Sequence, residues 1–126
     1  MQFDLAPDIQ KRIREILGKL DLPYIDATRV ICFRSTGSSS RARARIWSFP
    51  TIWQKALRIK PHYALEVLGE KFDHLHNHDQ TRILIHELMH IPKNFSGALL
   101  PHRGRGKRRI DHLTVEQLFR QYRAHR

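Results

Sequence analysis

The chain has 126 residues, of which 40% are hydrophobic and 28% charged, enough for one domain around one core. Charged side chains interrupt the N-terminal residues, and no apolar run approaches 18 residues. We therefore expect neither a signal peptide nor a membrane partner. The single cysteine, Cys32, excludes an intrachain disulfide and lies in an apolar run, so we interpret it as a small buried hydrophobic residue. These features predict a cytoplasmic protein.

The net charge of +11 is unevenly distributed along the chain. Residues 61–92 carry two basic and five acidic side chains, whereas residues 1–60 carry 12 basic and five acidic ones and residues 93–126 carry nine and two. The basic tracts are residues 41–45, with Arg41, Arg43 and Arg45, and residues 103–109, from Arg103 to Arg109. A solvated polar face is the favoured interpretation of the three arginines, and attraction to nucleic acid is the alternative.

The first half of the chain predicts a helix and two strands. Residues 1–22 carry apolar side chains at the helical period, with Pro7 suited to the first turn. Residues 28–35 are rich in Val, Ile and Phe and predict a strand. Residues 41–48 alternate, and a glycine- and serine-rich turn separates them from the first strand, so we expect the two strands to pair as a hairpin.

The second half predicts a strand and two helices. Residues 49–60 have helical spacing after Pro50 without a clear assignment, and residues 63–68 predict a strand. Residues 80–91 predict a largely buried helix, capped by Asn77 or Asp79 and ended by Pro92. Residues 114–122 predict a final helix, with Thr114 and Gln117 as a capping box.

The central helix contains His86-Glu87-Leu88-Met89-His90, the HExxH pattern of zinc hydrolases. Residues four apart lie on one helical face, so His86 and His90 can bind one Zn²⁺. Glu87 emerges about 100° round the helix, where a carboxylate can reach a metal-bound water as general base. The alternative, two histidines satisfied within a core helix, leaves the buried Glu87 unexplained.

A catalytic zinc usually takes three protein ligands. His102, 12 residues after His90, is the preferred third ligand, and His112 or Asp111 are alternatives; Asp111 can also orient a ligating imidazole. The group His74, His76 and His78 is better explained as a polar connection than as a second metal site. For stabilising an oxyanion, Tyr63, His112 and the arginines are only candidates.

Residues 85–92, followed by Ser96-Gly97 and Leu100-Pro101-His102, resemble the phage-type metallopeptidase family of viruses and prokaryotes. That family is similar to the minimal zincins and, more distantly, to SprT-like proteases. Residues 61–67 and 72–75 look like the family's edge strand and helix lead-in.

The resemblance implies zinc held by His86, His90 and His102, with Glu87 as catalytic base. It also implies that an edge strand at residues 63–68 receives a peptide by strand addition. The expected fold is an α+β, minimal zincin-like single domain over residues 1–126, in which a small mixed or antiparallel sheet packs with the HExxH helix, an N-terminal helix and a C-terminal helix.

The leading hypothesis is therefore a zinc-dependent peptidase acting on peptides or proteins. The alternatives are a metal-dependent nuclease, a SprT-like protease recruited to DNA, and a nucleic-acid-associated protein with a structural zinc. Glu87 and the 12-residue step to His102 favour the peptidase over the nuclease.

Overall fold

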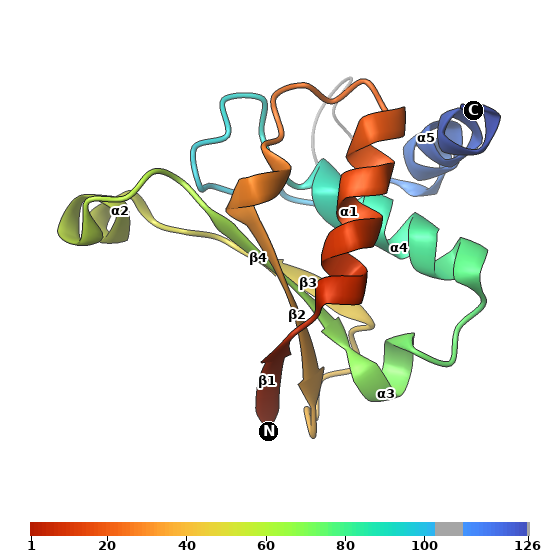
Figure 1. Ribbon diagram of the computed structural model, residues 1–126, viewed down its shortest axis with the longest axis horizontal. Helices are drawn as coiled ribbons and strands as arrows, with labels where there is room; N and C mark the ends of the chain where they lie inside the picture. The colour runs from red at the N-terminus through yellow and green to blue at the C-terminus, as the bar shows by residue number, and fades with distance from the viewer. Residues whose placement is uncertain (103–109, 126) are drawn as a thin grey trace.

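A mixed four-stranded sheet in the order β1-β2-β4-β3 forms the centre of the computed structural model, which describes residues 1–102 and 110–125. Helices α1 and α4 pack on one face of this sheet, and α5 packs against both helices (Figure 1). This arrangement is a small α+β fold, as predicted. The elements in chain order are β1 (Gln2–Leu5), α1 (Pro7–Lys19), the 3-10 turn η1 (Ala27–Arg29), β2 (Val30–Thr36), β3 (Ala44–Trp47), α2 (Thr51–Leu57), β4 (Tyr63–Leu68), α3 (Gly69–Phe72), α4 (Asn77–Met89) and α5 (His112–Ala124).

Strand β4 lies in the interior of the sheet, parallel to β2 and antiparallel to β3. Two predictions are therefore wrong. The strands at residues 28–35 and 41–48 do not form a hairpin, because β4 inserts between them, and residues 63–68 are not an edge strand. Five of the six β4 residues are buried, which is typical of a strand with neighbours on both sides. The edge strand beside α4 is β3.

The N-terminal residues also differ from the prediction, since a strand precedes the first helix. Residues 2–5 form β1, which pairs antiparallel with β2, and α1 begins only at Pro7. The fixed φ of Pro7 suits a first helical turn. The N–H of Ala6, the residue before the helix, donates a hydrogen bond to the Cys32 carbonyl. The helix thus covers residues 7–19 rather than 1–22.

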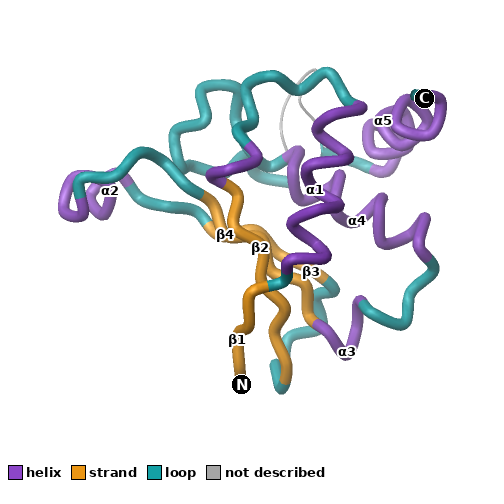
Figure 2. Tube along the Cα trace, viewed as in Figure 1, coloured by secondary structure: helices purple, strands orange, loops and turns teal. Residues whose placement is uncertain are grey.

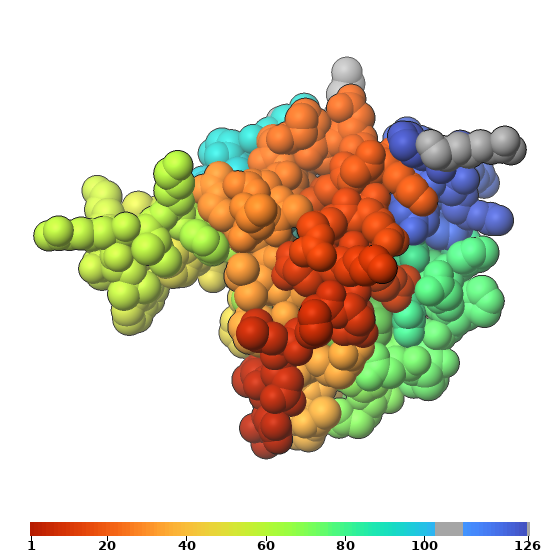
Figure 3. Space-filling view, viewed as in Figure 1, coloured from red at the N-terminus to blue at the C-terminus, as the bar shows by residue number. Residues whose placement is uncertain are grey.

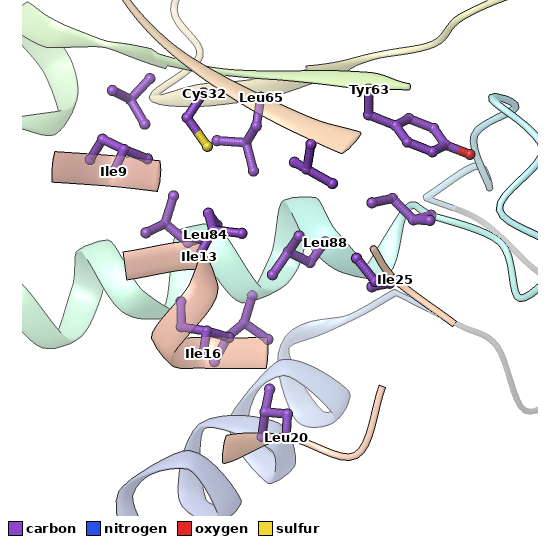
Figure 4. Packing of buried hydrophobic residues seen from close by; sticks show 14 of the residues in the cluster. Ile9, Ile13, Ile16, Leu20, Ile25, Cys32, Tyr63, Leu65, Leu84 and Leu88 are labelled. Carbon is purple, nitrogen blue, oxygen red and sulfur yellow. The ribbon is translucent and has the colours of Figure 1, made fainter. Parts of the chain in front are cut away.

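The core lies between the sheet and the two helices (Figure 4). Helix α1 contributes the predicted apolar stripe with Ile9, Ile13 and Ile16, and α4 contributes Leu84 and Leu88. The sheet contributes buried residues that include Val30, Cys32, Leu65 and Val67. Burial of Cys32 confirms its interpretation as a small core residue.

The N-terminal caps of the two later helices differ from the predicted ones. The His76 side chain accepts the His78 N–H at the start of α4, in place of Asn77 or Asp79. At the start of α5, Asp111 and Thr114 form a reciprocal capping box, so Thr114 is the third helical residue rather than the cap. Among the described residues, no helix has the length and apolar character needed to cross a bilayer.

Candidate metal centre

Three histidines from two segments meet at the C-terminal end of α4. His86 and His90 come from the helix and its cap, and His102 comes from the loop that follows. Figure 2 shows where helix α4 lies relative to the sheet and to α5. The His102 Nε2 atom lies 3.2 Å from the Nε2 atoms of both His86 and His90. Two nitrogens on a tetrahedral zinc, each about 2.0–2.1 Å from it, are about 3.3 Å apart. Two of the three nitrogen pairs therefore have the separation that a tetrahedral metal ion requires, and all three ligand atoms lie within 4.8 Å of one another.

The backbone of Leu100 orients His90. The Nδ1 of His90 lies 2.6 Å from the Leu100 carbonyl oxygen, and the Leu100 N–H donates to the His90 carbonyl at 2.7 Å. A carbonyl can only accept, so Nδ1 carries the proton and the Nε2 lone pair faces the other two histidines. The same two bonds hold Leu100 against the end of α4, two residues before His102.

Tyr63 anchors the preceding part of this loop (Figure 4). Its buried hydroxyl accepts the Gly97 N–H and donates to the Ala98 carbonyl, both at 2.8 Å. Gln54 of α2 donates to the Ser96 carbonyl at 2.8 Å. The loop that carries His102 is thus held from the sheet, from α2 and from α4. Because the Tyr63 hydroxyl is engaged by the loop, the structure gives no support to its candidacy for oxyanion stabilisation.

Glu87 lies beside the cluster with a side chain largely withdrawn from water. The residue is 8% exposed, and its Oε2 atom is 3.8 Å from the His86 Nε2. Burial raises the pKa of Glu87 to about 7, although a hydrogen bond from the backbone of Ile46 opposes the shift. Burial, with the neighbouring imidazoles of His90 and His102, lowers the pKa of His86 to about 4. At a pH between about 4 and about 7, Glu87 is protonated and His86 is deprotonated. Both side chains are then neutral, so the 3.8 Å contact is not an ion pair.

A cleft of about 1000 Å³ opens onto the cluster. It is lined by the edge strand β3 and the residues before it, by α4, by Leu99 and Leu100 of the loop, and by the start of α5. The backbone hydrogen bond from Ile46 to Glu87 links the edge strand directly to the carboxylate. A chain lying along β3 would therefore pass the three histidines and Glu87.

A family model described as "Putative phage metallopeptidase" matches residues 1–123. The chain belongs to this family. Comparisons with curated proteins and with solved structures gave no significant match. The match covers more of the chain than the residues that carry the resemblance, which are 61–67, 72–75 and 85–102. The description indicates a metallopeptidase, whose activity requires a metal ion, and the three histidines form a group that can hold one.

In this member of the phage metallopeptidase family, the other candidate metal ligands lie outside the group of three histidines. His112 and Asp111 line the cleft, but Asp111 caps α5 and neither belongs to the group that can hold a metal. His76 caps α4, and within the described residues only His86, His90 and His102 form such a group. The basic tract at residues 103–109 lies outside the described residues.

The structure also shows partners that sequence reasoning missed. These are the Leu100 carbonyl that orients His90, the Ile46 N–H that binds Glu87, and the Tyr63 hydroxyl that holds Gly97. Two of the three are backbone groups, whose contacts cannot be predicted from residue types. Of the residues in these contacts, only Gly97 could be noticed in the sequence, because its φ of +92° favours a residue without a Cβ.

Proposed function

We propose that this protein is a zinc-dependent peptidase in which His86, His90 and His102 hold the metal and Glu87 is the general base. The observation that carries the proposal is the convergence of three imidazole nitrogens, 3.2 Å apart in two pairs, beside a buried carboxylate. Three neutral imidazoles suit Zn²⁺ and leave a fourth tetrahedral position for water or substrate. A structural site would instead be closed by a fourth protein ligand, and no such ligand joins the group among the described residues.

The residues of this chain divide the work of hydrolysis. When bound, zinc polarises the scissile carbonyl and lowers the pKa of water to about 7. Glu87 takes a proton from the attacking water and passes it to the departing amine, a role that its position beside the cluster allows, since its Oε2 lies 3.8 Å from the His86 Nε2. The Leu100 carbonyl keeps His90 in the tautomer that presents Nε2. The Ile46 N–H fixes the Glu87 carboxylate in place.

The peptide would lie along β3 rather than along residues 63–68. Among the strands of the described part of the chain, β3 pairs with β4 alone, and residues of β3 line the cleft. A peptide added there would use main-chain hydrogen bonds and would run past Glu87. This placement keeps the strand-addition mode that the family resemblance implied and moves it to the strand that is at the edge.

The deciding experiment combines metal analysis with Glu87→Gln. The purified protein should contain about one zinc per chain and should cleave a denatured protein such as casein, and a chelator should abolish cleavage. The Glu87→Gln variant should keep its zinc and lose cleavage by a factor of at least about 10². Full cleavage by a zinc-loaded Gln variant would sink the mechanism.

The nucleic-acid hypotheses remain predictions. Arg41, Arg43 and Arg45 all line the cleft, and Arg45 is also held by the buried Glu66, with its Nε 2.8 Å from Oε1. A nuclease should degrade RNA in the same metal-loaded preparation, and recruitment to DNA should weaken steeply as salt rises. RNA degradation without casein cleavage would replace the peptidase by the nuclease.

A further inference from the structure

The face of the sheet that the helices leave open is apolar apart from Glu66 and its two partners Arg45 and Ser35. Directly paired residues share a face, and the register places Leu5 opposite Phe33, Phe33 beside Glu66, and Trp47 opposite Ala64. These residues alternate with Cys32 and Leu65, which point into the core. A sheet with one solvated face normally carries polar side chains there. Here Phe3, Leu5 and Trp47 are 50%, 69% and 47% exposed. We refer to this surface as the open face and define it by Phe3, Leu5, Ile31, Phe33, Trp47 and Ala64.

The open face is hollowed and continues toward α2. Two hollows, of about 290 and 220 Å³, share Phe33, Trp47 and Ala64 in their walls. The smaller hollow reaches Phe49 and His62, which lie on either side of α2 in the chain.

Helix α2 itself projects from the body (Figure 3) and buries none of its residues. Ile52, Trp53 and Leu57 are 75%, 55% and 55% exposed. An apolar surface of this extent is unusual unless another molecule covers it.

Charge identifies the kind of molecule. Residues 49–62 contain Lys55, Arg58 and Lys60 and no acidic residue. Glu66, the carboxylate on the open face, is already bound by Arg45, Trp47 and Ser35. Within residues 1–102 and 110–125, none of Lys55, Arg58 and Lys60 forms an ion pair, so positive charge flanks the apolar surface. A second copy in a two-fold interface would bring the same cations, and a flat bilayer offers no fixed side chain to fill the hollows.

We propose that the open face and α2 form a docking surface for another protein, which presents an amphipathic helix with large apolar anchors flanked by carboxylates. The anchors would fill the two hollows, and the carboxylates would face Lys55, Arg58 and Lys60. A helix docked on this surface would form a second layer over the face of the sheet that α1 and α4 do not cover. The open face lies on the side of the sheet opposite α4, and none of the residues that define it belongs to the group of histidines.

Intrinsic fluorescence tests the proposal, because the two tryptophans of the chain, Trp47 and Trp53, both belong to this surface. The full chain is titrated with a tryptophan-free synthetic helix of about 18 residues, or five turns. Its leucines occupy one face and its glutamates flank them, and a second peptide carries lysine in place of glutamate. The glutamate peptide should give a saturable blue shift, with a Kd at least about tenfold lower than the lysine peptide.

Two leucines provide a matched pair of variants. Leu5 on the open face and Leu113 on α5 are 69% and 71% exposed. Leu5→Ser should raise the Kd of the glutamate peptide about tenfold, whereas Leu113→Ser should leave it unchanged. If Leu5→Ser impairs folding, Ile52→Ser serves instead, because α2 buries nothing.

Each contrary outcome overturns the proposal. The absence of a shift, or equal shifts with the two peptides, would show that no acidic helix is recognised. A shift with phosphatidylglycerol vesicles but not with the peptide would assign the surface to a bilayer. A concentration-dependent shift of the protein alone, accompanied by dimer in sedimentation equilibrium, would assign it to a second copy.

Discussion

His90 and Leu100 are joined by two hydrogen bonds of opposite direction, one from backbone to backbone and one from imidazole to backbone. The pair connects the end of α4 to the loop that carries His102. The position of the third histidine therefore depends on a backbone contact rather than on its own side chain.

Replacing Leu100 tests this connection. Leu100→Pro removes the N–H that donates to His90, so the loop loses one of its two bonds to the helix. We expect zinc affinity to fall about 10- to 100-fold, the usual effect of disturbing groups that orient ligands. Leu100→Ala keeps both backbone bonds and is the control. A competition titration against a fluorescent zinc chelator measures both, and equal affinities would contradict the prediction.

The assignment of the third ligand is tested by exchanging histidines. His102→Ala should lose most of the bound zinc, because two imidazoles alone hold the ion weakly. His112→Ala, which changes a histidine that lines the same cleft, should retain zinc. Metal analysis after gel filtration gives the stoichiometry. Zinc retained by the His102 variant and lost by the His112 variant would reverse the assignment.

Glycine substitutions test the conformation of the loop. A Cβ at Gly97 would overlap the Phe49 carbonyl and the Gln54 side chain at a φ of +92°, so Gly97→Ala should destabilise the protein by about 2–4 kcal/mol. Gly18 in α1 has open space around its Cα, and Gly18→Ala should stabilise by about 0.5–1 kcal/mol. Urea unfolding of both variants gives the two signs, and two changes of the same sign would contradict the prediction.

The burial of Glu87 predicts a pH-dependent effect in the metal-free protein. Burial raises the pKa of Glu87 from 4.5 to about 7, so the folded state binds this proton more tightly than the unfolded state. The free energy of unfolding therefore falls as pH rises from about 4.5 to 7. Removing the titration by Glu87→Gln should stabilise the chelated protein by about 3 kcal/mol at pH 8. The gain should approach zero near pH 4.

Denaturant unfolding of the wild-type protein and the Gln variant, both with chelator present, measures this difference across the pH range. His86 titrates in both proteins, so its contribution cancels in the comparison. A difference that does not change between pH 4 and pH 8 would show that Glu87 is not held in its protonated form.

The periodicity of the sequence was sufficient to predict that His86 and His90 lie on one face of a helix and that α1 carries an apolar stripe. Both features depend on the geometry of a single helix. The 11 residues between His90 and His102 allowed a return to the helix, and the structure shows that return. The ligand assignments themselves stay predictions that the experiments above test.

Strand order could not be predicted, because pairing depends on contacts between distant segments. The edge position of residues 63–68 was implied by the family resemblance, and Glu66, a charged residue within the strand, did not contradict it. Its charge is tolerated because Arg45, Trp47 and Ser35 all bind it. Each partner comes from a neighbouring strand, so no pattern within residues 63–68 could reveal them.

The burial of Cys32 has a practical consequence for labelling. Cys32 is 1% exposed, and burial raises the pKa of its thiol to about 12, so it should not react with maleimides in the folded protein. A cysteine introduced at an exposed site, such as Lys55 on α2, would then be the only reactive thiol. A single dye or spin label could be attached there without first removing a native residue from the core.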